Sequence, residues 1–117
     1  MTNYSAGKLA EFLACGLLKT KGYKIVARNY KTGKGTHAGE IDIIAKKDNL
    51  LVFVEVKKRK TLENAAYAIS EVQKSRIKKG AEAFLALNPQ FENCDMRFDA
   101  ILIVFPLDFQ HIENAWF

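Results

Sequence analysis

The spacing of apolar positions predicts a helix near the N-terminus. Large hydrophobic residues recur every three or four positions, as on the buried face of a helix: Leu9, Phe12, Leu13 and Leu17. This helix should run from about Ser5 to Thr20, because Gly22 follows it as a typical C-terminal stop. Farther along, alternating apolar and polar residues predict a strand from Tyr23 to Tyr30.

Two further strand-like runs lie in the middle of the chain, between Glu40 and Arg59. The Asp48-Asn49 pair separates them and is typical of a tight turn that joins antiparallel strands. A two-residue turn of this kind pairs Lys47 with Leu50, and this pairing sets the register of the whole hairpin. The glycine-rich segment before the hairpin predicts a loop.

Charged residues interrupt both runs at positions where a core strand is normally apolar. The register places Asp42 opposite Glu55, with about 5 Å between their Cβ atoms. Glu40 then lies opposite Lys57. Because an unpaired buried carboxylate is costly, Asp42 and Glu55 require either a partner such as Lys57 or a bound cation.

A catalytic magnesium or manganese ion suits these residue types. Mg²⁺ prefers oxygen ligands and usually takes one or two carboxylates, which leaves its other positions to water and to a substrate phosphate. Asp42 and Glu55 are the predicted ligands, and Lys57 is predicted to orient or help deprotonate the attacking water. The residues therefore predict hydrolysis of a phosphodiester.

The second half of the chain predicts another helix and another strand. Ser70 is a typical N-cap with Gln73 as its capping-box partner, and the apolar stripe that follows ends near Asn88. Residues 96–105 read as a buried strand, and the tail from Leu107 either completes the core or makes an oligomer contact. Because a helix connects the hairpin to this strand, the crossover predicts a parallel strand pair.

Asp99 is a further charged residue, inside the last predicted strand. We expect it to form a structural salt bridge with a cation from a neighbouring strand or helix, and not with Arg97. The two cysteines, Cys15 and Cys94, lie far apart without the spacing of a zinc site or the density of a disulfide scaffold. Both are therefore expected to be buried thiols.

Length and composition indicate a single domain over residues 1–117, since 49% hydrophobic residues are sufficient for a core. Lysine and arginine number 18 against 13 acidic residues, and the net charge of +5 favours a polyanionic partner. Ordinary solubility explains such a charge as well. The segment Met1 to Lys8 lacks an apolar signal core and no run is long enough to span a bilayer, so we expect a cytoplasmic protein with no membrane partner.

The charged hairpin resembles a known signature. Asp42 followed by Glu55-Val56-Lys57 resembles the PD-(D/E)-x-K motif of restriction-endonuclease-like nucleases, with Ile41 in the place of the proline. From about residue 4 to residue 104 the chain also resembles the YraN family of bacterial proteins, which is similar to archaeal Holliday-junction resolvases. The landmarks of that resemblance are Gly7, Ala10-Glu11, Gly22-Tyr23, Arg28-Asn29-Tyr30, Gly39-Glu40-Ile41-Asp42, Val52-Phe53-Val54-Glu55-Val56-Lys57, Lys74, Arg76-Ile77 and Arg97-Phe98-Asp99.

This resemblance implies a restriction-endonuclease-like α/β fold, in which helices flank a central mixed β-sheet. It implies Asp42, Glu55 and Lys57 as the active site, and Glu11 on the first helix as a third metal ligand. It further implies a magnesium-dependent endonuclease that acts on DNA rather than RNA, with branched, Holliday-junction-like DNA as one candidate substrate. Because resolvases of this kind act as two-fold dimers, it also implies a homodimer.

Several polar side chains near this site have more than one interpretation. Lys74 and Arg76 lie on the second predicted helix, where they would grip a nucleic-acid backbone if that helix borders the cleft. Arg28, a family landmark, and Lys34 in the glycine-rich loop are candidate phosphate contacts, although a solvated loop explains Lys34 equally well. Glu40 either holds the active-site lysine through a salt bridge or reaches a second metal ion.

Two other functions stay open at this stage. A non-catalytic nucleic-acid-binding module would keep the nuclease fold and the basic helix, and a metal-binding structural protein would keep the carboxylates. Catalysis predicts that Glu55→Ala or Lys57→Ala abolishes turnover while binding stays nearly intact. A pure binder would depend on Lys74 or Arg76 instead.

Overall fold

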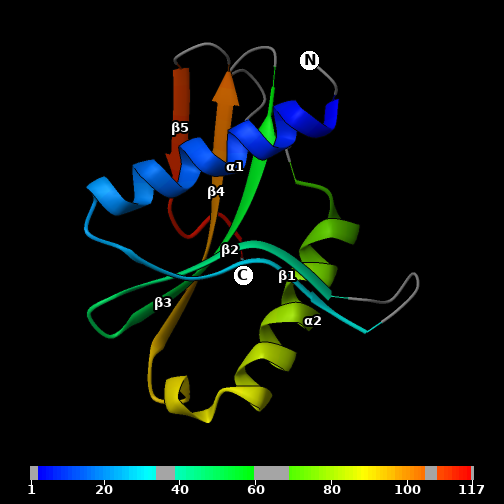
Figure 1. Ribbon diagram of the computed structural model, residues 1–117. Helices are drawn as coiled ribbons and strands as arrows, with labels where there is room; N and C mark the ends of the chain where they lie inside the picture. The colour runs from blue at the N-terminus through cyan, green and yellow to red at the C-terminus, as the bar shows by residue number, and fades with distance from the viewer. Residues whose placement is uncertain (1–2, 34–38, 60–68, 105–107, 117) are drawn as a thin grey trace.

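A five-stranded mixed sheet forms the centre of the molecule, as Figure 1 shows for the computed structural model, which describes residues 3–33, 39–59, 69–104 and 108–116. The strands lie side by side in chain order: β1 (Lys24–Thr32), β2 (Gly39–Lys47), β3 (Leu50–Lys58), β4 (Asp95–Val104) and β5 (Asp108–Ile112). One helix covers each face of the sheet. The expected α/β class, with helices flanking a mixed sheet, is confirmed.

The register of the hairpin is the one that its turn predicts. β2 and β3 are antiparallel and Lys47 pairs with Leu50, while Asp48 adopts a left-handed backbone (φ 52°) in the turn between them. The predicted crossover is also confirmed, because α2 (Glu71–Leu87) connects β3 to β4 and these two strands are parallel. A short 3-10 helix at Pro89–Phe91 follows α2.

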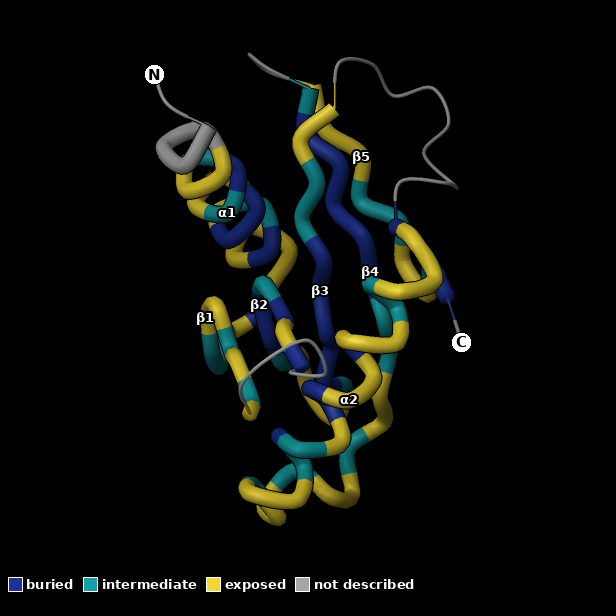
Figure 2. The backbone as a smooth tube through the Cα atoms, turned by 90° about the vertical axis from the view of Figure 1, so that its right-hand side faces the viewer, coloured by how far each residue is buried: buried dark blue, intermediate teal, exposed yellow. Residues whose placement is uncertain are grey.

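The two faces of the sheet carry separate hydrophobic cores (Figure 2). The first core packs α1 (Asn3–Thr20) on the sheet and includes Ala10, Ala14, Cys15, Leu18, Ile43, Ala45, Val52, Val54, Ile101 and Ile103. The second packs α2 on the opposite face and includes Ile77, Ala81, Phe84, Ile41, Ile44, Leu51, Phe53 and Leu102. No helix among the described residues is long and apolar enough to cross a membrane.

The C-terminal tail completes the core, which resolves the alternative left open by the sequence. β5 pairs with β4 in antiparallel fashion, and Trp116 is buried against Phe98. Both cysteines are free thiols, as expected. Cys15 is buried in the core under α1, whereas Cys94 is only half-buried, because it lies in the turn that leads into β4.

The start of α2 has the predicted capping box. The Ser70 hydroxyl accepts a hydrogen bond from the Gln73 backbone N–H at 3.1 Å, and the Gln73 side chain accepts one from the Ser70 N–H at 3.2 Å. These two bonds satisfy backbone donors that the first helical turn leaves without an intrahelical partner. The capping box therefore fixes where the helix begins and, with it, the residues of its first two turns.

Farther along, α2 touches β2 directly, without side chains between the two backbones. A Cβ atom added at Gly39 would lie 2.4 Å from the backbone N of Gly80. Only glycine allows this approach, because real Cβ contacts are never so short. The contact brings α2 against the start of β2, immediately before Glu40.

We therefore expect Gly39→Ala to destabilise the protein by about 1–3 kcal/mol, since backbone atoms must move to admit the methyl group. The measurement is urea unfolding followed by circular dichroism. Gly16→Ala is the matched control, because Gly16 is exposed on α1 with nothing within 4 Å of an added Cβ. That change should raise stability by up to about 1 kcal/mol, and equal losses in the two variants would contradict the steric argument.

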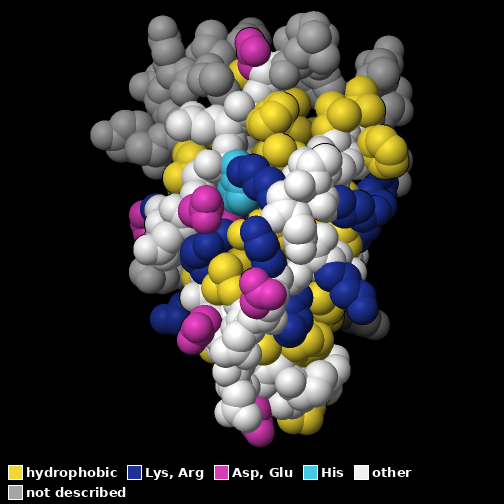
Figure 3. Space-filling model, turned by 90° about the vertical axis from the view of Figure 1, so that its left-hand side faces the viewer, with side chains coloured by type: hydrophobic (Ala, Val, Ile, Leu, Met, Phe, Trp, Pro, Cys, Tyr) yellow, Lys and Arg dark blue, Asp and Glu magenta, His cyan; other side chains and the backbone are white. Residues whose placement is uncertain are grey.

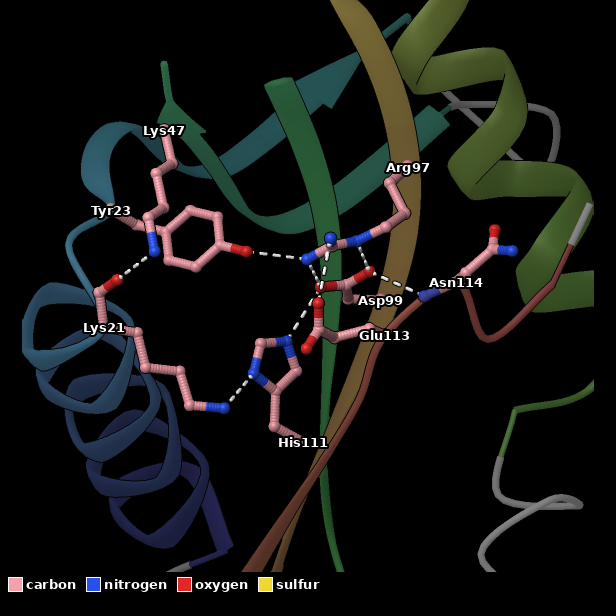
Figure 4. Close-up of polar contacts among 8 residues, drawn as sticks. All are labelled: Lys21, Tyr23, Lys47, Arg97, Asp99, His111, Glu113 and Asn114. Atoms are coloured by element: carbon pink, nitrogen blue, oxygen red, sulfur yellow. Dashed lines mark hydrogen bonds and ion pairs between the residues drawn. The ribbon is translucent and has the colours of Figure 1, made fainter. Parts of the chain in front are cut away.

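A buried ionic network joins β4 to the C-terminal segment (Figure 4). Asp99 has no exposed surface and accepts four hydrogen bonds: two from Arg97 at 2.8 Å, one from His111 Nε2 at 2.8 Å and one from the Asn114 backbone N–H at 3.0 Å. The prediction that Asp99 would not pair with Arg97 was wrong. These residues are two positions apart in one strand, so both side chains lie on the same face of the sheet.

The network continues to the segment between α1 and β1 (Figure 4). Arg97 donates to the Tyr23 hydroxyl at 2.6 Å, and Lys21 Nζ lies 2.7 Å from His111 Nδ1. Because an ammonium only donates, His111 Nδ1 is the acceptor and its Nε2–H donates to Asp99. The cluster thus ties the end of α1 to strands that lie at the far side of the sheet.

Candidate functional site

A polar cleft of about 270 Å³ opens where α1, β2, β3 and α2 meet. Its lining residues are Gly7, Ala10 and Glu11 of α1, Glu40 and Asp42 of β2, Glu55, Val56, Lys57 and Lys58 of β3, and Gln73 and Arg76 of α2. The cleft forms where β2 parts from β3. Their pairing ends at Ile43 and Val54, whereas β3 stays paired with β4 as far as Lys58.

The alternation of side chains between the two faces of the sheet is interrupted in β2 at Asp42. Ile41 and Ile43 are two positions apart and should share a face, yet Ile41 packs in the core under α2 and Ile43 in the core under α1. On the adjacent strand, Asn29 stands between the paired residues Arg28 and Tyr30 with a left-handed backbone (φ 51°). The change of face thus coincides with Asp42, whose side chain lines the cleft.

Asp42 and Glu55 lie next to each other at the floor of the cleft. Asp42 Oδ2 accepts a hydrogen bond from the Val56 backbone N–H at 2.8 Å, in place of a strand-to-strand bond. Glu55 is only 9% exposed. Burial, then the hydrogen bond to Asp42 and the charge of Asp42, raise the pKa of Glu55 to about 9. In the absence of a cation, Glu55 is therefore protonated at neutral pH and donates to Asp42.

Glu11 approaches the same point from α1. Its Oε1 atom is buried and has no hydrogen-bond partner among the described residues. Burial, followed by the charge of Asp42, raises the pKa of Glu11 above its usual range. A buried carboxylate oxygen without a partner is costly, so the arrangement favours a cation at this place.

Lys57 and Glu40 stand at the mouth of the cleft. The Nζ atom of Lys57 lies 3.9 Å from Glu55 Oε1, and its side chain is mostly buried. Glu40 is exposed, and its negative charge helps to raise the pKa values of Glu11 and Glu55. Four carboxyl groups therefore line the cleft together with three basic side chains, those of Lys57, Lys58 and Arg76.

The residues present fit a hard divalent cation. Across residues 3–33, 39–59, 69–104 and 108–116, no group of three or more His, Cys, Asp or Glu side chains is placed so that it could hold a metal ion. Magnesium does not need one, because it keeps several waters and binds through one or two carboxylates. The proton of Glu55 beside Asp42 and the unpartnered oxygen of Glu11 are the features that a bound cation would satisfy.

The predicted nucleic-acid contacts divide into three groups. Arg76 lines the cleft, as expected for a helix that borders it. Lys74 does not: it lines a separate pocket and forms an ion pair with Glu71 at 3.1 Å. Arg28 is exposed on β1, outside the cleft wall. Lys34 lies outside the residues that the structure describes.

Sequence reasoning missed two residues that line the cleft, Gln73 and Lys58. Gln73 has the predicted capping role, and its position in the first turn of α2 also brings it to the cleft. Its signal was the spacing to Arg76, since residues three apart share a helix face. Lys58 directly follows Lys57, and no motif in the sequence distinguishes it as a cleft residue.

Comparison with known proteins places the chain in a family. The sequence profile of the uncharacterised protein family UPF0102 matches residues 10–103. The chain belongs to this family. UPF0102 is the YraN family that the sequence landmarks indicate.

Its relatives match over most of their length. A UPF0102 protein of Paramagnetospirillum magneticum is 44% identical over 94% of this chain and 85% of its own. A UPF0102 protein of Rhodopseudomonas palustris is 42% identical over 97% of this chain and 84% of its own. One of Nitrobacter winogradskyi is 46% identical over 86% and 81%, respectively. The UPF0102 profile covers every cleft residue from Ala10 to Arg76.

Proposed function

We propose that this UPF0102 protein is a magnesium-dependent endonuclease that hydrolyses phosphodiester bonds in DNA. The observation that carries the proposal is the carboxyl pair of Asp42 and Glu55, in which the buried Glu55 holds a proton, next to the unpartnered oxygen of Glu11. A structural role does not require this arrangement, since hydrophobic residues would stabilise the same strands at less cost. A cation-binding role does.

Asp42, Glu55 and Glu11 are the groups that would hold Mg²⁺, or Mn²⁺ in its place. Bound there, the ion would supply Lewis-acid chemistry, by polarising a phosphoryl oxygen and lowering the pKa of a bound water. Glu55 must lose its proton for this binding, because a metal ligand is an ionised carboxylate. Lys57 lies near enough to stabilise the resulting negative charge.

The chain's own side chains then position and stabilise the reacting groups. Lys57 orients the attacking water, and its ammonium stabilises the charge that develops on the phosphorane as the bond to the leaving oxygen breaks. Arg76 presents a guanidinium to the substrate phosphate from α2. Gln73 supplies a further polar group one helical turn away. Glu40 is positioned at the mouth of the cleft, where a second cation would bind.

The net charge of +5 favours a polyanionic substrate. We propose DNA, with branched, Holliday-junction-like DNA as the first structure to test. The likeness to resolvases supports a homodimer, since a two-fold assembly would place two such clefts on the two symmetric strands of a junction.

The test is cleavage of labelled linear, nicked and four-way-junction DNA with Mg²⁺ or Mn²⁺. The wild type should cut at least one of these substrates, and Glu55→Ala should lose that activity. Glu92→Ala is the control, because Glu92 is exposed and lies outside the residues that line the cleft. If the folded wild type binds DNA without cutting any substrate, the nuclease proposal fails and a nucleic-acid-binding module takes its place.

A further inference from the structure

Basic residues follow the seam between α1 and β1, away from the floor of the cleft. On α1, Glu11, Cys15 and Lys19 recur every four residues and therefore share one stripe of the helix. Burial raises the pKa of the Cys15 thiol, and the charges of Arg28 and Lys19 oppose this shift. The charge of Arg28 also acts on Glu11. Arg28 of β1, which packs beside α1, is therefore near enough to the stripe for its charge to act on Glu11 and Cys15.

Two lysines continue the seam beyond the end of α1 (Figure 4). Lys47 Nζ donates to the Lys21 backbone carbonyl at 2.8 Å and lies 5.6 Å from the centre of the Tyr23 ring. Lys21 Nζ in turn donates to His111 Nδ1 at 2.7 Å. Both ammonium groups are thereby held in place by partners that carry no negative charge at this contact.

The cations of this seam, Lys19, Lys21, Arg28 and Lys47, are not neutralised locally. Within the described part of the chain, none of them forms an ion pair with a carboxylate. Figure 3 shows Lys and Arg side chains across the middle of this side of the molecule, with several Asp and Glu side chains among them. In the same pair of strands, β1 and β2, Lys24 lies directly opposite Lys46. Like charges at directly opposed positions destabilise a sheet.

This arrangement differs from a surface that is charged for solubility alone. Such a surface intersperses both signs, because scattered pairs avoid the repulsion that a single-sign cluster creates. Here the fold holds cations together and leaves them without acidic partners. Their repulsion would be relieved by a polyanion that follows the seam.

We propose that the α1–β1 seam binds the phosphate backbone of a nucleic-acid strand that leads to the cleft. From Glu11 to Lys19 the helix rises about 12 Å, roughly the length of four base-pair steps of a duplex. The seam would therefore contact phosphates several steps away from the bond that is cut. This inference rests on the proposed function, because it takes the cleft as the point where the same strand is hydrolysed.

The test is the salt dependence of DNA binding by K19Q/K47Q, measured by fluorescence anisotropy with a labelled duplex. Ca²⁺ replaces Mg²⁺ in this assay so that no substrate is cut. Loss of two phosphate contacts should make the slope of log K against log salt shallower by about 1.8, and weaken binding roughly tenfold at moderate salt. K78Q/K79Q removes the same charge from exposed positions of α2 and should bind like the wild type.

Thermal unfolding of each variant separates lost binding from lost structure, since Lys47→Gln removes a hydrogen bond to the Lys21 carbonyl. K19Q/R28Q, which keeps that bond, should show the same shallower slope. Unchanged binding by both seam variants would overturn the seam while leaving DNA cleavage, and thus the nuclease proposal, intact. If both seam variants bind DNA more weakly and the wild type cuts no substrate, the seam proposal is supported and the nuclease proposal is rejected. A folded wild type that does not bind DNA, or equal losses in K78Q/K79Q, would also overturn the seam.

Discussion

Glu55→Gln should abolish metal-dependent cleavage and, at the same time, make the metal-free protein more stable at neutral and alkaline pH. Burial, with the hydrogen bond and charge of Asp42, raises the pKa of Glu55 from 4.5 to about 9 in the folded protein. Between these values the folded state binds a proton that the unfolded state does not. Stability is therefore fully present below about pH 4.5 and is lost as pH rises toward 9, by up to about 1.4 kcal/mol per pH unit.

Glutamine keeps the shape of the protonated acid and does not titrate, so the variant should escape this loss. The measurement is the unfolding midpoint of both proteins from pH 5 to pH 9 in a chelator, and again with Mg²⁺. Magnesium should stabilise the wild type, because it binds only the folded state, and should have little effect on the variant. Glu92→Gln serves as the control, since Glu92 is exposed, lies outside the residues that line the cleft and should leave the pH slope nearly unchanged.

Parallel pH profiles for the wild type and Glu55→Gln would contradict the buried proton. Equal stabilisation of both proteins by Mg²⁺ would instead show that Glu55 is not a ligand. The two results are independent, so the electrostatic and the metal-binding parts of the argument can fail separately.

Much of the site follows from one short turn. Asp48 and Asn49 fix a two-residue connection, and this connection sets the pairing of Lys47 with Leu50 that the structure shows. Alternation along the strands then brings Glu55 and Lys57 to one face. Local rules sufficed here because a hairpin is a local structure, whose register depends on few residues.

The parts of the site that depend on contacts between residues far apart in the sequence could not be predicted from the sequence. Ile41 and Ile43, on either side of Asp42, pack under different helices, and no window of sequence reveals this change of face. Lys74 and Arg76 are neighbours in sequence and both matched the family, yet only Arg76 reaches the cleft. The docking of α2 decides this, and it depends on the backbone contact of Gly39 with Gly80.

The pairing of Asp99 with Arg97 was predicted wrongly although the alternation of strand side chains favours it. Residues two apart in a strand share a face, so Arg97 was available to Asp99 from the start. The contribution of His111 and of the Asn114 backbone N–H was not visible in the sequence, because β5 brings them back to β4 from beyond residue 107.

Asp99→Asn should be the most destabilising single change in the sheet, by about 3–5 kcal/mol, because it removes the fully buried carboxylate charge that pairs with the partly buried guanidinium of Arg97. The carboxylate accepts four hydrogen bonds that the amide cannot accept together, since one end of the amide only donates. Urea unfolding near pH 7 measures the loss. Asp95→Asn is the control at the exposed start of the same strand and should cost less than about 1 kcal/mol.

The pH dependence gives this prediction a second, independent check. Burial acts to raise the pKa of Asp99, but hydrogen bonds from His111, Arg97 and the Asn114 N–H outweigh it and hold that pKa below its usual 3.8. The stability it contributes is present above pH 3.8 and is lost as the pH falls through the lower folded value. The difference in the free energy of unfolding between the wild type and Asp99→Asn should therefore become smaller at acidic pH. A gap that stays constant from pH 7 to pH 3 would mean that packing, and not the charge of Asp99, holds β4 and β5 to the rest of the molecule.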